Sequence, residues 1–396
     1  MPIRNGRMLA SPFAFFRGAA GVMAHDLVKT PATAVRVQAC GDCHLLNFGL
    51  FASVERRLIF DINDFDETLP APWEWDVKRL AASIAVAARD LGLSDRKARD
   101  VVEVSVRAYR VALRKLSHMS PLDVWYTLLD IQTLIDMAPD AATKKQERAY
   151  VKAARKHVVE HVYPKLTAEV GGRPRFVDHP PLVFHYLKDD MEERARESLL
   201  AYRQSLPDER RVLFDRYRLE DFVVKVVGIG SVGTRCYLGL LLDEDNNPLI
   251  LQLKEATQSV LEPYAGRSAY DNHGERVVTG QRLMQSSSDI FLGWARGPRG
   301  YDFYARQLRD MKFSPSLHAF STPQLEQYVE ACGAALARAH AKSGDATTIS
   351  GYLGKSDSFD KAVGSFALTY ADQTERDHKA LERAVRSGRI KAIDEG

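Results

Sequence analysis

The sequence predicts an α+β protein with a larger helical part and a smaller antiparallel β part. Apolar residues recur at spacings of three and four along residues 72–116, which is typical of amphipathic helices. Residues 222–253 instead contain short runs rich in Val, Leu and Ile that are separated by turn residues, which is typical of strands. We therefore predict three segments: a helical part at 1–210, a β-rich part at 215–312, and closing helices at 320–396 that pack back on the first part.

Composition narrows the class of protein. The chain has 396 residues, of which 45% are hydrophobic and 27% are charged, so it can bury a sizeable core. Its formal net charge of +3 does not indicate a nucleic-acid partner, and its four cysteines do not make a disulfide framework. Pro12 interrupts the apolar stretch at 8–16, and no window approaches the roughly 20 apolar residues of a membrane span. We expect a cytoplasmic protein without membrane or nucleic-acid partners, and of unknown oligomeric state.

The individual elements follow from caps, turns and apolar spacing. Ser94 is a suitable N-cap for one helix, and Pro323 suits the first position of another. The Gly- and Pro-rich stretch 171–181 is expected to be a loop. The predicted helices are 13–28, 72–93, the one after Ser94, 120–136, 139–166, 191–204, 272–285, 323–343 and 358–388. The predicted strands are 50–51, 57–62, 222–227, 236–242, 249–253, 290–295 and 301–307, with a further one before residue 40.

Two acidic turns near the start of the chain are candidates for chemistry. The first runs from Cys40 to Asn47, and the second includes Asp64 and Asp66 at the end of a predicted strand. Mg²⁺ prefers oxygen ligands, and a carboxylate with an amide carbonyl on adjoining strand ends meets that preference. A further carboxylate, Asp42, can accept the proton of a substrate hydroxyl. Asp42 and Asn47 are five positions apart, the spacing of the base and the asparagine in the kinase catalytic loop.

A glycine-rich segment lies past the midpoint of the chain. Gly228, Gly230, Ser231 and Gly233 lie between two predicted strands, and a third strand ends at Lys254. A dinucleotide-binding glycine motif would open a helix, whereas strand, glycine loop, strand and a strand with lysine is the protein-kinase arrangement. The glycine backbone and Lys254 would then contact nucleotide phosphates. Kinases pair this lysine with a glutamate, for which Glu275 is the first candidate.

Other partners of Lys254 stay open. Glu255 and Glu262 also lie close to it in the sequence, and Gln281 is a further candidate to orient it.

The first acidic turn resembles a known catalytic loop. The pattern Gly-Asp-x-His-x-x-Asn at 41–47 is similar to that of aminoglycoside and choline phosphotransferases, in which a histidine usually precedes the glycine; Cys40 stands there in this chain. The resemblance implies that Asp42 is the base and that Asn47 and Asp64 are metal ligands, with Asp66 assisting. It also implies that Asp76 is the buried aspartate that braces the loop.

Several longer motifs resemble one bacterial family, domain of unknown function 2252. They include Ser-Pro-Phe-Ala-Phe-Phe-Arg-Gly at 11–18, Asn-Asp-Phe-Asp-Glu-Thr-Leu-Pro at 63–70 and Lys-Val-Val-Gly-Ile-Gly-Ser-Val-Gly-Thr-Arg at 225–235. The resemblance covers nearly the whole chain and implies a protein-kinase-like fold with two lobes. Kinases place the glycine loop before the base, whereas this chain places it after, so we expect a circular permutation. The helix at 323–343 should then pack beside the Asp42 loop.

Rival motifs keep other functions open. Cys40, Cys43 and His44 match a c-type haem attachment pattern and also suggest a zinc site. His157, Glu160 and His161 match a zinc metalloprotease pattern.

The function expected from the sequence is a Mg²⁺-dependent phosphotransferase. It would use ATP or GTP and act on an unknown small-molecule or protein acceptor. The alternatives are a nucleotidyltransferase, a non-catalytic nucleotide-binding protein or the metalloprotease.

Overall fold

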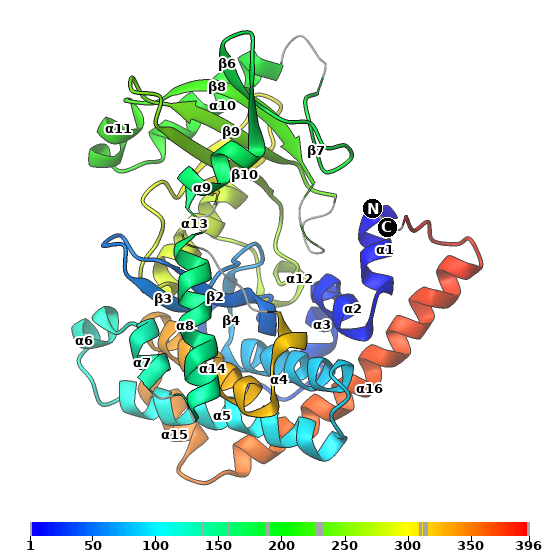
Figure 1. Ribbon diagram of the computed structural model, residues 1–396. Helices are drawn as coiled ribbons and strands as arrows, with labels where there is room; N and C mark the ends of the chain where they lie inside the picture. Colours follow the sequence, from blue (N-terminus) through cyan, green and yellow to red (C-terminus); the bar gives the residue numbers. More distant parts are fainter. Residues whose placement is uncertain are drawn as a thin grey trace.

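The computed structural model describes residues 2–393 apart from 137, 139, 157, 187–190, 227, 229–232, 309–310 and 312–315. The fold is mixed α+β, with small antiparallel sheets, which confirms the predicted class. Figure 1 shows a six-stranded sheet at the top, a group of long helices at the bottom and two small antiparallel strand pairs between them. None of the described helices is long and apolar enough to cross a membrane.

The lower group of helices is built from both ends of the sequence. Its members are α1 (Pro2–Leu9), α2 (Pro12–Gly18), α3 (Ala20–Leu27), α4 (Trp73–Asp90), α5 (Asp95–Leu116), α14 (Thr322–Ser343), α15 (Ala346–Leu353) and α16 (Ser358–Arg386). The side chain of Ser94 accepts a hydrogen bond from the Lys97 amide, so the predicted N-cap is present. A Cβ atom on Gly333 of α14 would lie 2.2 Å from the Ser105 carbonyl oxygen of α5, so only glycine allows this approach. The last helices therefore pack against the first ones.

Two antiparallel strand pairs hold the acidic turns, and the second lies within the loop that joins the strands of the first. β1 (Arg36–Ala39) pairs with β4 (Leu69–Pro72), and β2 (Phe48–Ala52) pairs with β3 (Leu58–Ile62). The short 3₁₀ helix η1 (Leu45–Asn47) precedes β2. The backbone amide of Asn63 donates to the carbonyl oxygen of Asn47, which joins the end of one turn to the start of the other. Both acidic turns consequently lie at the same end of the two strand pairs.

The six-stranded sheet is antiparallel throughout, in the order β11-β12-β10-β9-β8-β7. Side chains alternate between its faces, so neighbours such as Leu253 and Lys254 point in opposite directions. Leu253 faces α10 and α11, which cover the outer face with an apolar core. The strands and their covering helices are β7 (Val183–Phe184), β8 (Arg218–Lys225), β9 (Cys236–Leu242), β10 (Pro248–Ala256), β11 (Gly293–Arg296), β12 (Asp302–Gln307), α10 (Met191–Gln204) and α11 (Asp208–Phe214).

The inner face of the six-stranded sheet faces the two small strand pairs. Helix α13 (His273–Met284) lies between the six-stranded sheet and the two strand pairs in Figure 1, and the short α12 (Glu262–Ala265) follows β10. Helix α9 (Val159–Leu166) covers the far part of this face, where it packs on Leu238 and Ile250. Lys254 therefore points into the space between the sheet and the acidic turns.

The segment between α5 and β7 differs from the sequence prediction. The helices predicted at 120–136 and 139–166 are four shorter ones: α6 (Pro121–Tyr126), α7 (Ile131–Asp136), α8 (Ala141–Arg155) and α9. The loop predicted at 171–181 begins inside a hairpin of β5 (Thr167–Val170) and β6 (Arg173–Phe176). Gly171 and Gly172 form its turn with positive φ angles of 61° and 77°, so the glycines mark a hairpin and not a loop.

Candidate functional site

The loop that carries Asp42 is held from below by a buried carboxylate. Asp76, in the first turn of α4, accepts hydrogen bonds from the backbone amides of Cys40 at 2.7 Å and Gly41 at 3.1 Å. His340 of α14 lies with its Nε2 atom 3.3 Å from the same carboxylate. Both side chains are fully buried. The loop is thus fixed by helices from the start and the end of the chain.

Gly41 lets this loop approach the second acidic turn. Its φ angle is +82°, and a Cβ atom there would lie 2.3 Å from the carbonyl oxygen of Glu67. No other residue fits both the left-handed backbone and the close contact. The two turns therefore touch through the main chain.

Asp42 is oriented by an arginine that the sequence did not suggest. Arg79 of α4 donates from Nε at 2.6 Å and from Nη2 at 2.5 Å to the carboxylate oxygen Oδ1. Arg79 is buried and also donates to the carbonyl oxygen of Phe16 in α2, so its position is fixed. Asn47 donates from Nδ2 to the Asp42 carbonyl oxygen at 2.7 Å. The carboxylate of Asp42 is held in one orientation, with part of it reaching solvent.

A second arginine lies near the same carboxylate. Burial lowers the pKa of Arg17, which lies at the end of α2, and the charge of Asp42 opposes that change. The Nε atom of Arg17 is buried without a hydrogen-bond partner among the described residues. His44 is also buried, which lowers its pKa to about 4 and keeps its ring neutral at physiological pH. The charge around Asp42 is therefore positive and comes from the arginines.

The structure brings Lys254 to the second acidic turn. Its Nζ atom lies 2.7 Å from Oδ2 of Asp66, although the two residues are 188 positions apart. Tyr304, the neighbour of Lys254 on β12, donates its hydroxyl to the other oxygen of Asp66 at 2.6 Å. Burial lowers the pKa of Lys254, but Asp64 and Asp66 together raise it well above its ordinary value. Lys254 is therefore a charged ammonium group directed at both acids.

Arg306 adds a second cation to this face of the sheet. It lies two residues after Tyr304 on β12, so strand alternation gives it the same direction. Its Nη1 atom donates to the carbonyl oxygen of Asn63 at 3.0 Å. Burial lowers its pKa, whereas Tyr304, Asp64 and Asp66 raise it, and the net direction is upward. Side chains two residues apart on β12 point the same way, so the sequence would have indicated Arg306 once the pairing of β12 with β10 was known.

The expected pairing of Lys254 with Glu275 is wrong, because Asp66 takes that position. Glu275 lies in the first turn of α13, and the next residue, Arg276, faces the acidic turn in its place. Arg276 is buried and donates to the carbonyl oxygens of Asp66, Thr68 and Thr257. Consecutive residues of a helix differ by about 100° in direction, so only one of the two can point at the loop.

The other candidate partners of Lys254 are also engaged elsewhere. Glu255 forms an ion pair with Arg235 at 2.9 Å. Gln281 donates to the side chain of Gln285 at 3.0 Å. The side chain of Glu262 accepts from the Ser259 amide at 3.3 Å. None of the three orients Lys254.

Glu67 lies in the second acidic turn, against the segment that precedes α12. Burial raises the pKa of Glu67 to about 7, while a hydrogen bond from the Val260 amide at 2.7 Å acts in the opposite direction. Asp66 and Asp42 raise this pKa further, and Arg276 lowers it. Glu67 is thus a carboxyl group that titrates near neutral pH beside the proposed metal ligands.

The base of β3 is tied to α14 by a buried ion pair. Arg338 donates from Nη2 to both oxygens of Asp61, at 2.7 and 2.8 Å, and neither side chain is accessible to solvent. Tyr328 lies on the same helix, and its hydroxyl group donates to the carbonyl oxygens of Leu45 and Phe48. The helix at 322–343 therefore packs beside the Asp42 loop, where the sequence prediction placed it.

Some predicted residues fall outside the described part of the chain. Gly230 and Ser231 do, and so do His157 and the side chain of Glu160. Gly228 is exposed, and Gly233 has a φ angle of +108°; they flank the segment between β8 and β9. His161 lies exposed on α9. The geometry of the glycine loop and of the metalloprotease motif therefore stays a prediction.

One group with metal-ligand spacing is present among the described residues. The sulfur atoms of Cys40 and Cys43 and a carboxylate oxygen of Asp76 lie within 4.8 Å of one another. All three residues are buried, and His44 is not part of the group. Asp76 already accepts two backbone hydrogen bonds, and burial raises the pKa of Cys43 to about 11. We read this group as two packed thiols beside the bracing aspartate.

Comparison with known proteins gives the family. The sequence profile of domain of unknown function 2252, described as an uncharacterized protein conserved in bacteria, matches residues 1–384. The chain therefore belongs to this family. No curated protein and no solved structure matches it.

Proposed function

We propose that this protein is a Mg²⁺-dependent phosphotransferase that binds ATP or GTP in a protein-kinase-like fold whose parts occur in permuted order. The observation that carries the proposal is the 2.7 Å contact between Lys254 and Asp66. It joins β10, the second strand after the glycine segment, to the turn that ends β3. A kinase needs these two groups at one pocket, because one contacts the phosphates and the other the metal.

The order of elements around Lys254 supports a kinase-like small lobe. β8, the glycine segment, β9 and β10 are consecutive and antiparallel, and Lys254 lies near the end of β10. A helix, α13, follows and then two more strands complete the sheet. In a kinase the chain would next enter the large lobe with the catalytic loop. Here it enters α14, and the catalytic loop comes from residues 40–47 at the start of the chain, against which α14 packs.

The residues present fit Mg²⁺ and nucleotide phosphates. Asn47 uses its Nδ2 atom on Asp42, so its side-chain oxygen is the atom left as a metal ligand, together with Asp64. Asp66, whose two oxygens already accept from Lys254 and Tyr304, would only assist. Oxygen donors of this kind suit Mg²⁺ and not a soft metal. Mg²⁺ would neutralise charge on the phosphates when bound. Lys254 and Arg306 would bind phosphate oxygens, since both are cations on the inner face of the sheet, Lys254 buried and Arg306 half-buried.

Asp42 would orient the acceptor hydroxyl and take up its proton. The ion pair with Arg79 fixes one carboxylate oxygen, Oδ1, and leaves the other for the acceptor. Because Arg79 is itself anchored on Phe16, the orientation of Asp42 does not depend on the nucleotide. Positioning of this kind is the main contribution of a protein to phosphoryl transfer.

The test begins with nucleotide binding. We expect MgATP or MgGTP to raise the melting temperature, and Lys254→Met to weaken calorimetric affinity by about tenfold or more. Lys97→Met, an exposed lysine on α5, is the matched control and should bind as the parent does. Absence of stabilisation by both nucleotides would overturn the proposal.

The second step separates the chemistries. We expect label from γ-labelled ATP to appear on an acceptor in a metabolite or protein extract, and Asp42→Asn to lower that transfer by about 10²–10⁴-fold while nucleotide affinity stays within about twofold. Label transferred from α-labelled ATP would instead indicate nucleotidyl transfer. Binding without transfer of either label would indicate a non-catalytic nucleotide-binding protein.

A further inference from the structure

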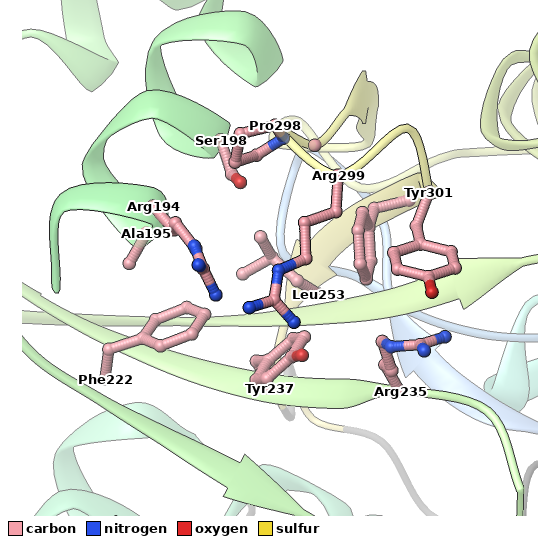
Figure 2. Close-up of a pocket in the computed structure, with 12 residues that line it drawn as sticks. Arg194, Ala195, Ser198, Phe222, Arg235, Tyr237, Leu253, Pro298, Arg299 and Tyr301 are labelled. Atoms are coloured by element: carbon pink, nitrogen blue, oxygen red, sulfur yellow. The ribbon is translucent and has the colours of Figure 1, made fainter. Parts of the chain in front are cut away.

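A second pocket lies on the outer face of the sheet, behind Lys254. Figure 2 shows it between α10, the strands β8, β9 and β10, and the turn at 297–301 that joins β11 to β12. Leu253 lines this pocket, whereas its neighbour Lys254 points to the other face of β10. The space, counted with its opening to solvent, is about 570 Å³. The sheet separates this pocket from the proposed nucleotide site.

The floor of the pocket is aromatic. Phe222 and Tyr237 stack with ring centroids 5.0 Å apart, and Tyr237 contacts Phe303 at 5.9 Å. Tyr301 forms one side, where the guanidinium group of Arg235 lies 3.6 Å from its ring centroid. Flat apolar surfaces of this kind favour a planar or apolar ligand body.

The rim of the pocket is cationic. Arg194, Arg235 and Arg299 approach it from α10, from the start of β9 and from the turn at 297–301, and Figure 2 shows Arg194 and Arg299 directed at the same central space. Arg235 is held in place by its ion pair with Glu255, at 2.9 and 3.0 Å. None of the described residues that line the pocket is acidic. Because Glu255 balances the charge of Arg235, the positive charge of the rim that no described carboxylate pairs with is that of Arg299.

Arg299 is the group that distinguishes this pocket from an ordinary surface hollow. It is exposed in the middle of the turn, and it forms no hydrogen bond or ion pair with the part of the chain that the structure describes. It still lies close to the floor: burial raises the pKa of Tyr237, and the charges of Arg235 and Arg299 both oppose that change. A guanidinium group above an aromatic ring can grip a carboxylate or phosphate with two parallel hydrogen bonds.

From this arrangement we infer that the pocket is a binding site for a small organic anion, a carboxylate or phosphate on an aromatic or other flat body. The anionic group is bound by Arg299 together with Arg194, and the body of the ligand lies on Phe222 and Tyr237. The site is independent of the proposed nucleotide site, because the two are on opposite faces of the sheet.

The experiment uses simple probes on the full chain. Phenyl phosphate and benzoate are titrated by calorimetry and by saturation-transfer NMR, with the neutral benzamide and with inorganic phosphate as comparisons. We expect the aromatic anions to bind more tightly than either comparison, since only they use both the rim and the floor. Equal binding of benzamide, or no binding of any aromatic anion at millimolar concentration, would overturn the inference.

Variants locate the binding. Arg299→Gln should weaken phenyl phosphate by about tenfold, and the double change with Arg194→Gln should weaken it further. Arg218→Gln, an exposed arginine at the start of β8 and outside the pocket, is the matched control. Lys254→Met should leave phenyl phosphate binding unchanged, which separates this site from the nucleotide site. Equal binding by the Arg299 variant and the parent would remove the pocket as the site.

Discussion

The ion pair between Lys254 and Asp66 can be measured by a double-mutant cycle. The changes are Lys254→Met, Asp66→Asn and both together, with the free energy of unfolding taken from urea titrations in EDTA. At 2.7 Å and an effective dielectric constant of about 20, the Coulomb attraction of such a pair is about 6 kcal/mol. Two features of the structure reduce it. Asp66 has 31% of its side chain exposed, and Asp64 also faces the ammonium group.

We therefore expect a coupling energy of about 2 kcal/mol. Asp66→Asn should lower the free energy of unfolding more than Lys254→Met does. It leaves an ammonium group that is only 5% exposed, whereas Lys254→Met leaves a carboxylate that still has water and the hydroxyl of Tyr304. The pair of Arg203 and Asp215 is the matched control, because its distance is 2.5 Å but its side chains are 31% and 45% exposed. Its coupling should stay below about 1 kcal/mol. A coupling for Lys254 no larger than this control would refute the reasoning.

Three further predictions concern the support of the site. Glu67→Gln should leave the free energy of unfolding unchanged at pH 4.5 and raise it by up to about 3 kcal/mol at pH 8. The folded pKa of Glu67, about 7, lies above the unfolded value of 4.5, so the stability that the protonated carboxyl group contributes to the parent is lost as pH rises between these values. Urea titrations across this pH range check the prediction, and a difference that does not depend on pH contradicts it. Gly41→Ala should cost more than about 3 kcal/mol and Gly92→Ala only about 1 kcal/mol, since both glycines have positive φ but only the first would clash; equal melting temperatures of the two variants would exclude the clash. Arg338→Met should cost about 3–5 kcal/mol by leaving the Asp61 carboxylate buried without its cation, and Asp61→Asn in the same chain should restore part of this loss in thermal unfolding; no restoration would mean that packing, not charge, is responsible.

Much of the fold followed from patterns that are local in the sequence. The helix predicted at 323–343 is found at 322–343, because Pro323 lies in its first turn and Gly344 follows its last residue. The segment before β7 was predicted poorly. Helix periodicity ran across residues 156–158 without a strong stop signal, and the pair Gly171–Gly172 is compatible with either a loop or a hairpin turn.

The acids of the candidate site were visible in the sequence, but most of the residues that orient them were not. Asp42, Asp64 and Lys254 stand in motifs with characteristic spacing. Arg79 lies 37 positions from Asp42 and belongs to no recognisable motif. Only the packing of α4 against the loop gives it a partner. The same holds for Arg276, which a one-residue difference in helix direction separates from the expected Glu275. Local spacing identifies reactive groups, whereas their positioning partners depend on tertiary contacts.

The contacts of α14 have a consequence for synthesis of the protein on the ribosome. Tyr328 donates to the carbonyl oxygen of Leu45, and the two residues are 283 positions apart. The segment with Asp42 therefore leaves the ribosome long before the helix that completes its surroundings. Until that helix emerges, the Cys40–Asn47 segment lacks its partners Tyr328 and His340. Nascent chains that stop short of α14 should accordingly be targets for chaperones and should not bind nucleotide, because long-range contacts form last.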